Sequence, residues 1–211
     1  VGDKDAVMKY AQYALKDKEN GQFAMQLLTD AYKAKGDTAK WVEKLQEGIV
    51  KFPENQYFFA NLVDYYSSSN QNDKAMQFAN DMLAKDPNNK LYLYVKAYLY
   101  HNMKDYEKAI EFYKKTLDVD PTYAEACSNL GLVYLLQAQD YADKAPTDIN
   151  DPNYATAQAN IKKFYEEAKP YYEKARELKP DQKDLWLQGL YRVYYNLNMG
   201  PEFEAIEKLM N

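Results

Sequence analysis

The chain has 211 residues, of which 46% are hydrophobic and 28% are charged, and this balance excludes an intrinsically disordered chain. Acidic residues outnumber basic ones by 32 to 27, and no stretch gathers basic residues without acidic neighbours, so nucleic-acid binding is not expected. The longest apolar run, residues 91–100, is broken by Lys96 and is far shorter than the roughly 20 residues that span a membrane. A membrane-spanning segment is therefore not expected either.

Four prolines provide evidence for an internal repeat. Pro53, Pro87 and Pro121 follow one another at intervals of 34 residues, and Pro180 follows after the same interval plus an insertion of about 25 residues. Proline cannot continue a helix, and an Asp or Asn just after it can cap the next one. Each proline therefore predicts the end of one helix and the start of another.

The elements predicted in the first half of the chain are helices arranged in pairs. Residues 1–21 are predicted to form a half-repeat, a single second helix whose first helix lies outside the chain. Residues 22–55, 56–89 and 90–123 each hold two apolar stripes at helical spacing, separated by a polar turn, which predicts a helix hairpin.

The remaining elements are less regular. Residues 124–182 are predicted to form a hairpin with an insertion of about 25 residues near 140–164, of which residues 140–153 are predicted to form an exposed loop. The long second helix contains Pro170, where we expect a kink or a short break. Residues 183–211 are predicted to form a degenerate C-terminal repeat that serves as a cap. The loop at 140–153 is either decoration or a second contact site.

These units resemble the tetratricopeptide repeats. That family carries a bulky residue at position 4, Leu and a small residue at 7 and 8, Tyr at 11, Ala at 20, an aromatic at 24, Ala at 27 and Pro at 32. The unit that begins at Lys90 departs from the pattern at Lys96 and Thr116. It matches the pattern at Leu93, Ala97, Tyr100, Ala109, Tyr113 and Pro121. The resemblance implies an all-α fold, a right-handed α-α superhelix of about five hairpins plus the N-terminal half-repeat.

The sequence offers little material for catalysis or for cofactor binding. With one histidine and one cysteine, sites of the Cys and His type and Cys-His nucleophiles are not expected. The seven glycines are scattered, which excludes a Gly-rich phosphate loop, and the acidic run at 148–151 lacks the Gly and the distal Glu of a calcium loop. We therefore predict no catalytic, cofactor-binding or metal-binding residue, and we interpret His101 as a polar surface histidine.

The resemblance implies that a protein or peptide binds on a concave face lined by the first helices. The family's carboxylate clamp is not expected, because its basic residues are missing, whereas rings and amides suit an extended peptide. Tyr94 and Tyr98 have an alternative interpretation, in which they pack only within the repeats. The candidate peptide-binding residues are Gln26, Asp30, Tyr57, Asn61, Asp64, Tyr94, Tyr98, His101, Glu125 and Asn129.

Two other function classes stay open, namely a structural or self-assembling module and an accessory protein that binds carbohydrate. The sequence does not predict the identity of the partner or the oligomeric state. The Tyr- and Asn-rich composition is similar to that of exported bacterial repeat proteins, and the chain opens on Val1 with no methionine. We therefore expect the periplasm or cell surface of a bacterium, with the cytoplasm as the alternative.

Overall fold

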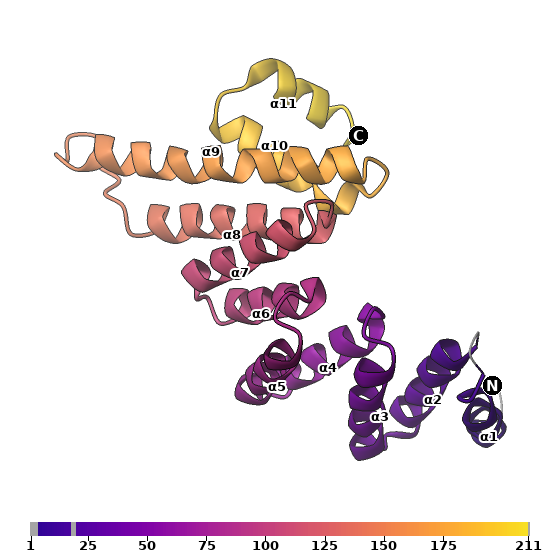
Figure 1. The fold of residues 1–211 in the computed structure, drawn as a ribbon. Helices are drawn as coiled ribbons and strands as arrows, with labels where there is room; N and C mark the ends of the chain where they lie inside the picture. The colour runs from indigo at the N-terminus through magenta and orange to yellow at the C-terminus, as the bar shows by residue number, and fades with distance from the viewer. Residues whose placement is uncertain (1–3, 18–19, 211) are drawn as a thin grey trace. The chain divides into compact units, whose positions relative to one another are not determined.

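A computed structural model describes residues 4–17 and 20–210, and these residues form eleven α-helices and one 3-10 helix without any strand (Figure 1). The remaining positions of the predicted N-terminal half-repeat, 1–3 and 18–19, lie outside the described residues, as does Asn211 of the predicted cap. The chain divides into two compact units, one ending at Phe78 and the other beginning at Ala79.

The first unit consists of consecutive helices that pack against their neighbours in sequence, α1 on α2, α2 on α3 and α3 on α4. Helix α5 begins in this unit and ends in the next. Their bounds are α1 (Lys4–Ala14), α2 (Gly21–Lys35), α3 (Thr38–Lys51), α4 (Gln56–Ser68) and α5 (Asn72–Lys85).

Short polar side chains start α3 and α4, and Asn55 is a cap that the sequence predicts after Pro53. The Asp37 side chain accepts a hydrogen bond from the backbone N–H of Lys40, and the Asn55 side chain accepts one from Tyr57, each at 3.1 Å. Gly36 ends α2 with a φ of 74°, a left-handed conformation that costs glycine little. The turns between helices are therefore specified locally.

The second unit adds contacts between alternate helices to those between neighbours. Helix α8 packs on α7 and α9, and it also contacts α6 and α10. Contacts between alternate helices are expected when the first helices of the hairpins line one side and the second helices line the other. Here α6, α8 and α10 are first helices, and α7 and α9 are second helices. The bounds are α6 (Lys90–Asn102), α7 (Tyr106–Val119), α8 (Ala124–Ala142), α9 (Tyr154–Leu178), η1 (Lys183–Leu185), α10 (Leu187–Asn196) and α11 (Gly200–Glu207).

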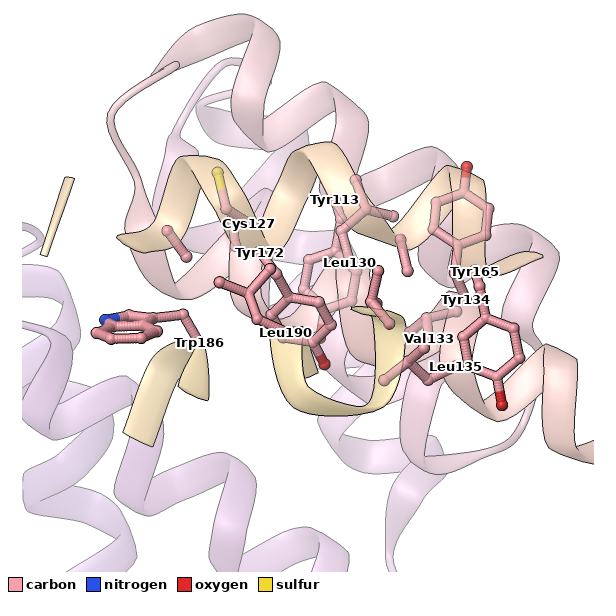
Figure 2. Packing of buried hydrophobic residues seen from close by; sticks show 14 of the residues in the cluster. Tyr113, Cys127, Leu130, Val133, Tyr134, Leu135, Tyr165, Tyr172, Trp186 and Leu190 are labelled. Atoms are coloured by element: carbon pink, nitrogen blue, oxygen red, sulfur yellow. The ribbon is translucent and has the colours of Figure 1, made fainter. Parts of the chain in front are cut away.

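The core of the second unit is built from aliphatic and tyrosine side chains on these helices (Figure 2). Leu130 and Leu135 of α8 are buried beside Tyr113 of α7 and Tyr172 of α9. Glycine permits the close approach: a Cβ on Gly189 would lie 2.2 Å from the Tyr172 ring, far inside contact distance. Small residues thus let a large ring fill the space between helices.

The structure shortens the predicted loop and corrects one expectation about Pro170. The loop predicted at 140–153 begins only after Ala142, because α8 continues past Gln139 and buries Ala138. Helix α9 runs unbroken through Pro170 beside α8 (Figure 1), so a break is wrong. Pro170 is exposed, whereas Ala168 and Tyr172 on either side of it are buried. This packing outweighs the one backbone hydrogen bond that proline removes.

Candidate functional site

In the first unit the candidate residues of α2 and α4 bind one another. The Tyr57 hydroxyl donates a hydrogen bond to the Asp30 carboxylate, and the Lys33 ammonium donates one to Asn61 Oδ1 at 3.4 Å. Asn61 in turn donates to the Tyr57 carbonyl oxygen at 2.9 Å. Burial and the Asp30 hydrogen bond both raise the pKa of Tyr57, so its hydroxyl remains a donor at neutral pH.

The other two candidates of this unit lie at its margins. The Gln26 amide donates to Asn55 Oδ1 at 3.5 Å, and Asn55 also caps α4, so this contact ties α2 to the start of α4. Asp64 is exposed on α4. Its carboxylate and that of Asp30 give this face exposed acidic groups.

In the second unit Tyr94 is a packing residue. Its ring centroid lies 4.9 Å from that of Tyr123 and 5.8 Å from that of Tyr113, and its hydroxyl accepts a hydrogen bond from the Asn129 amide at 2.8 Å. Burial, and next the charge of Glu125, raise the pKa of Tyr94, so it stays neutral. The hydrogen bond joins α6 to α8. Tyr94 and Asn129 are therefore already occupied by each other.

Tyr98 and His101 form a different pair, one turn further along α6. Their ring centroids lie 6.2 Å apart in an edge-on geometry, and both side chains are half-buried. Within the described residues the buried Nδ1 of His101 has no hydrogen-bond partner, and burial lowers the pKa of His101 below its ordinary value of 6.5. His101 is therefore only partly a surface residue, because packing beside Tyr98 takes the imidazole partly out of water.

The comparisons with known proteins agree with this arrangement of helices. A family model described as a TPR repeat matches residues 97–137, and one described as a tetratricopeptide repeat matches residues 161–182. The chain carries tetratricopeptide repeats. Both matches fall in the second unit of this TPR chain.

Solved structures similar to the TPR chain show the same fold at low sequence identity. A structure of the MamA protein has a TM-score of 0.54 at 16% identity, with 90% of each chain covered. PilW, described as a widely conserved type IV pilus biogenesis factor, has a TM-score of 0.59 at 15% identity, with 99% of this chain and 84% of PilW covered. No curated protein matches the sequence.

The human IFIT1 dimer, solved with m7Gppp-AAAA, has a TM-score of 0.67 at 19% identity. The alignment covers 99% of this chain but only 47% of IFIT1, so the chain spans about half the length of that protein. At such identities these likenesses establish the fold alone.

Groups with chemical reactivity are scarce in the TPR chain. Burial raises the pKa of the Cys127 thiol to about 11, which makes it a poor nucleophile. Over residues 4–17 and 20–210, no cluster of three or more His, Cys, Asp or Glu side chains could hold a metal ion. None of the helices in the same ranges is long and apolar enough to cross a membrane.

One cluster in the second unit lies outside the candidate residues that the sequence predicts. Lys96 and Lys115 both lie against the ring of Phe112, beside a cavity in the surface. The sequence carried a signal for it, because Lys96 stands where the repeat pattern places Leu.

Proposed function

We propose that this TPR chain is a non-catalytic scaffold that binds an extended segment of another protein on its first helices. The repeats support the coarser part of this proposal, since stacked hairpins offer a long surface for contact with another protein. The finer part is the location of the binding surface on the first helices, which we infer for each unit separately.

The observation that carries the location is the half-exposed pair of Tyr98 and His101 on α6. Rings of this kind offer rigid contact area at low entropic cost, and a neutral imidazole can both donate and accept a hydrogen bond. The hydrogen bond between Asn129 and Tyr94, one turn earlier on α6, holds α6 against α8. We therefore place Tyr94 and Asn129 in a supporting role and Tyr98, His101 and Glu125 in contact with the bound segment.

Charge favours a segment with basic residues. Asp30 and Asp64 are exposed in the first unit, Glu125 is half-exposed in the second, and the chain as a whole has a formal net charge of −5. Charge of this sign repels phosphates. The capped RNA in the IFIT1 structure is therefore a poor guide to the ligand here, whereas Lys or Arg side chains complement this face.

A selection from a random peptide library, displayed on phage and panned against the whole chain, tests the proposal. The selected peptide is synthesised, and its dissociation constant is measured by fluorescence polarisation for the wild type and the variants Tyr98→Ala and His101→Ala. We expect each variant to weaken binding by about tenfold, as hot-spot residues do.

Glu111→Ala on α7 is the control, because Glu111 is an exposed residue of a second helix. It should leave the dissociation constant unchanged. Equal dissociation constants for the wild type, Tyr98→Ala and His101→Ala would contradict the assignment of the binding site to this pair. Failure to select any peptide above background would oppose the scaffold function itself.

A further inference from the structure

The position that holds Lys96 is a core position in the other repeats. Counted from the start of each unit, it is position 7, where Leu28, Leu62 and Leu130 are at most 1% exposed. Lys96 is only half-buried, so its side chain reaches the surface by stretching its aliphatic stem. A core leucine has been replaced by a cation in this one repeat.

The charge of Lys96 lies in a crowded and unusual environment. Its ammonium is 4.4 Å from the centroid of the Phe112 ring, and the Lys115 ammonium is 4.6 Å from the same centroid. Lys115 forms an ion pair with Glu111 at 2.6 Å, but no ion pair reaches Lys96 from the residues that the structure describes. Burial, and next the charge of Lys115, lower the pKa of Lys96. One cation in the cluster therefore lacks a counterion.

A cavity of about 470 Å³ opens beside this cluster, on the side of the second helices. Leu83, Leu93 and Val119 form its apolar wall together with the Phe112 ring, and Asp118 contributes a carboxylate to the lining. A partly desolvated charge costs stability. Leucine at position 96 would remove this charge and extend the apolar wall, so the sequence carries a cost at this position.

We propose that this cavity binds a small organic monocarboxylate, with its apolar body on Leu83, Leu93 and Val119 and its carboxylate on the Lys96 ammonium. Lys115 contributes a second, weaker contact, since Glu111 already balances its charge. Lys96 makes no ion pair among the described residues, which suits one carboxylate, and the Asp118 carboxylate in the lining disfavours a doubly charged phosphate. Small-molecule sites typically combine an apolar wall with a few placed polar groups in this way. This site is separate from the proposed peptide-binding face.

Titration of the whole chain with hexanoate, followed by two-dimensional NMR of the backbone amides, tests the inference. We expect saturable shifts around Lys96 and Phe112. Lys96→Met keeps the length and the apolar stem but removes the charge, and it should weaken hexanoate binding about tenfold or more. Lys96→Gln gives a second neutral variant should the first one fold poorly by circular dichroism. Lys74→Met, an exposed lysine of the first unit, is the control and should bind as the wild type does.

Two further ligands test the contribution of the charge and that of the apolar body separately. Hexanamide has the same body without the charge, and inorganic phosphate has the charge without the body, so both should bind at least about tenfold more weakly than hexanoate. The inference is overturned by an absence of saturable shifts, by equal binding to Lys96→Met and the wild type, or by phosphate binding as tightly as hexanoate.

Discussion

Two tyrosines on first helices, Tyr57 in the first unit and Tyr94 in the second, make the same kind of contact in different surroundings. Each hydroxyl forms a hydrogen bond with a neighbouring first helix, Tyr57 with Asp30 of α2 and Tyr94 with Asn129 of α8. Tyr57 meets a charged and exposed partner, whereas Tyr94 meets a neutral amide and lies between two other tyrosine rings. Tyr57 stands at position 2 of its repeat and Tyr94 at position 5, so the two contacts differ in register as well as in surroundings.

The comparison shows why a position in the repeat does not by itself identify a binding residue. The repeat pattern predicts binding residues all along the first helices. Some of these residues hold the helices together, and others remain available to a ligand. Tyr94 belongs to the first kind and Tyr98, one turn away on the same helix, to the second. Burial and hydrogen-bond partners decide between the two roles, and the sequence pattern contains neither.

Removal of the two rings should give the largest difference between the units. Tyr94→Ala should lower the free energy of unfolding by about 3 kcal/mol, because its partly buried ring packs against the rings of Tyr113 and Tyr123. Tyr57→Ala should cost about 1–2 kcal/mol, because its ring is half-exposed and its partner can bond to water. Urea denaturation of both variants measures the difference. Equal losses would show that the rings are equivalent and that the assigned roles are wrong.

Restoration of the repeat pattern at position 96 should have a smaller effect of opposite sign. Lys96→Leu removes a partly desolvated charge and extends the apolar wall, so it should stabilise the protein by about 1–2 kcal/mol. The melting temperature should rise by about 3–6 °C, measured by differential scanning calorimetry. Lys74→Leu, the exposed control, should change it little. A lower melting temperature for Lys96→Leu would mean that the lysine is a structural requirement of this repeat.

Removal of the two tyrosine hydroxyl groups alone should cause smaller losses of stability than removal of the rings. Tyr94→Phe leaves the Asn129 amide facing a ring edge and should cost about 1–1.5 kcal/mol, whereas Tyr57→Phe should cost less than about 0.5 kcal/mol. The measurement is again the free energy of unfolding in urea. A larger loss for Tyr57→Phe would show that its bond to Asp30 is the stronger of the two.

The smallest predicted effect concerns the link between the starts of α6 and α8. The Asp120 carboxylate accepts hydrogen bonds from the Lys90 ammonium at 2.8 Å and from Thr122, and these lower its pKa from the ordinary value of 3.8 to about 2. A lowered pKa stabilises the fold above about pH 4, and this contribution is lost as the pH falls from 4 to 2. The stability difference between wild type and Asp120→Asn should therefore shrink over that range. A difference that stays constant would contradict this account.

The fold was largely predictable because its signals are local and repeated. Pro53 and Pro87 are followed by the capping residues Asn55 and Asn89, and both caps form as expected. The insertion was harder, since the two helical segments that extend α8 and α9 stabilise each other only after they meet. No local pattern predicts that packing on both sides of Pro170 keeps α9 continuous.

The candidate site was predictable only in outline. The repeat register placed Tyr57, Tyr94 and Tyr98 on first helices, and all three lie there. Two of them form internal hydrogen bonds with residues distant in sequence. Tyr57 bonds to Asp30, 27 residues away, and Tyr94 to Asn129, 35 residues away. The partial burial of His101 depends equally on tertiary neighbours, which its position late in a first helix does not reveal.

Hydrogen–deuterium exchange of the whole chain, with and without a saturating selected peptide, tests the central claim most directly. The account predicts slower exchange along α6 and α8 when the peptide is bound, and little change in the second helices α7 and α9. Protection confined to α7 and α9, or to the loop between α8 and α9, would place the binding surface elsewhere and contradict the account.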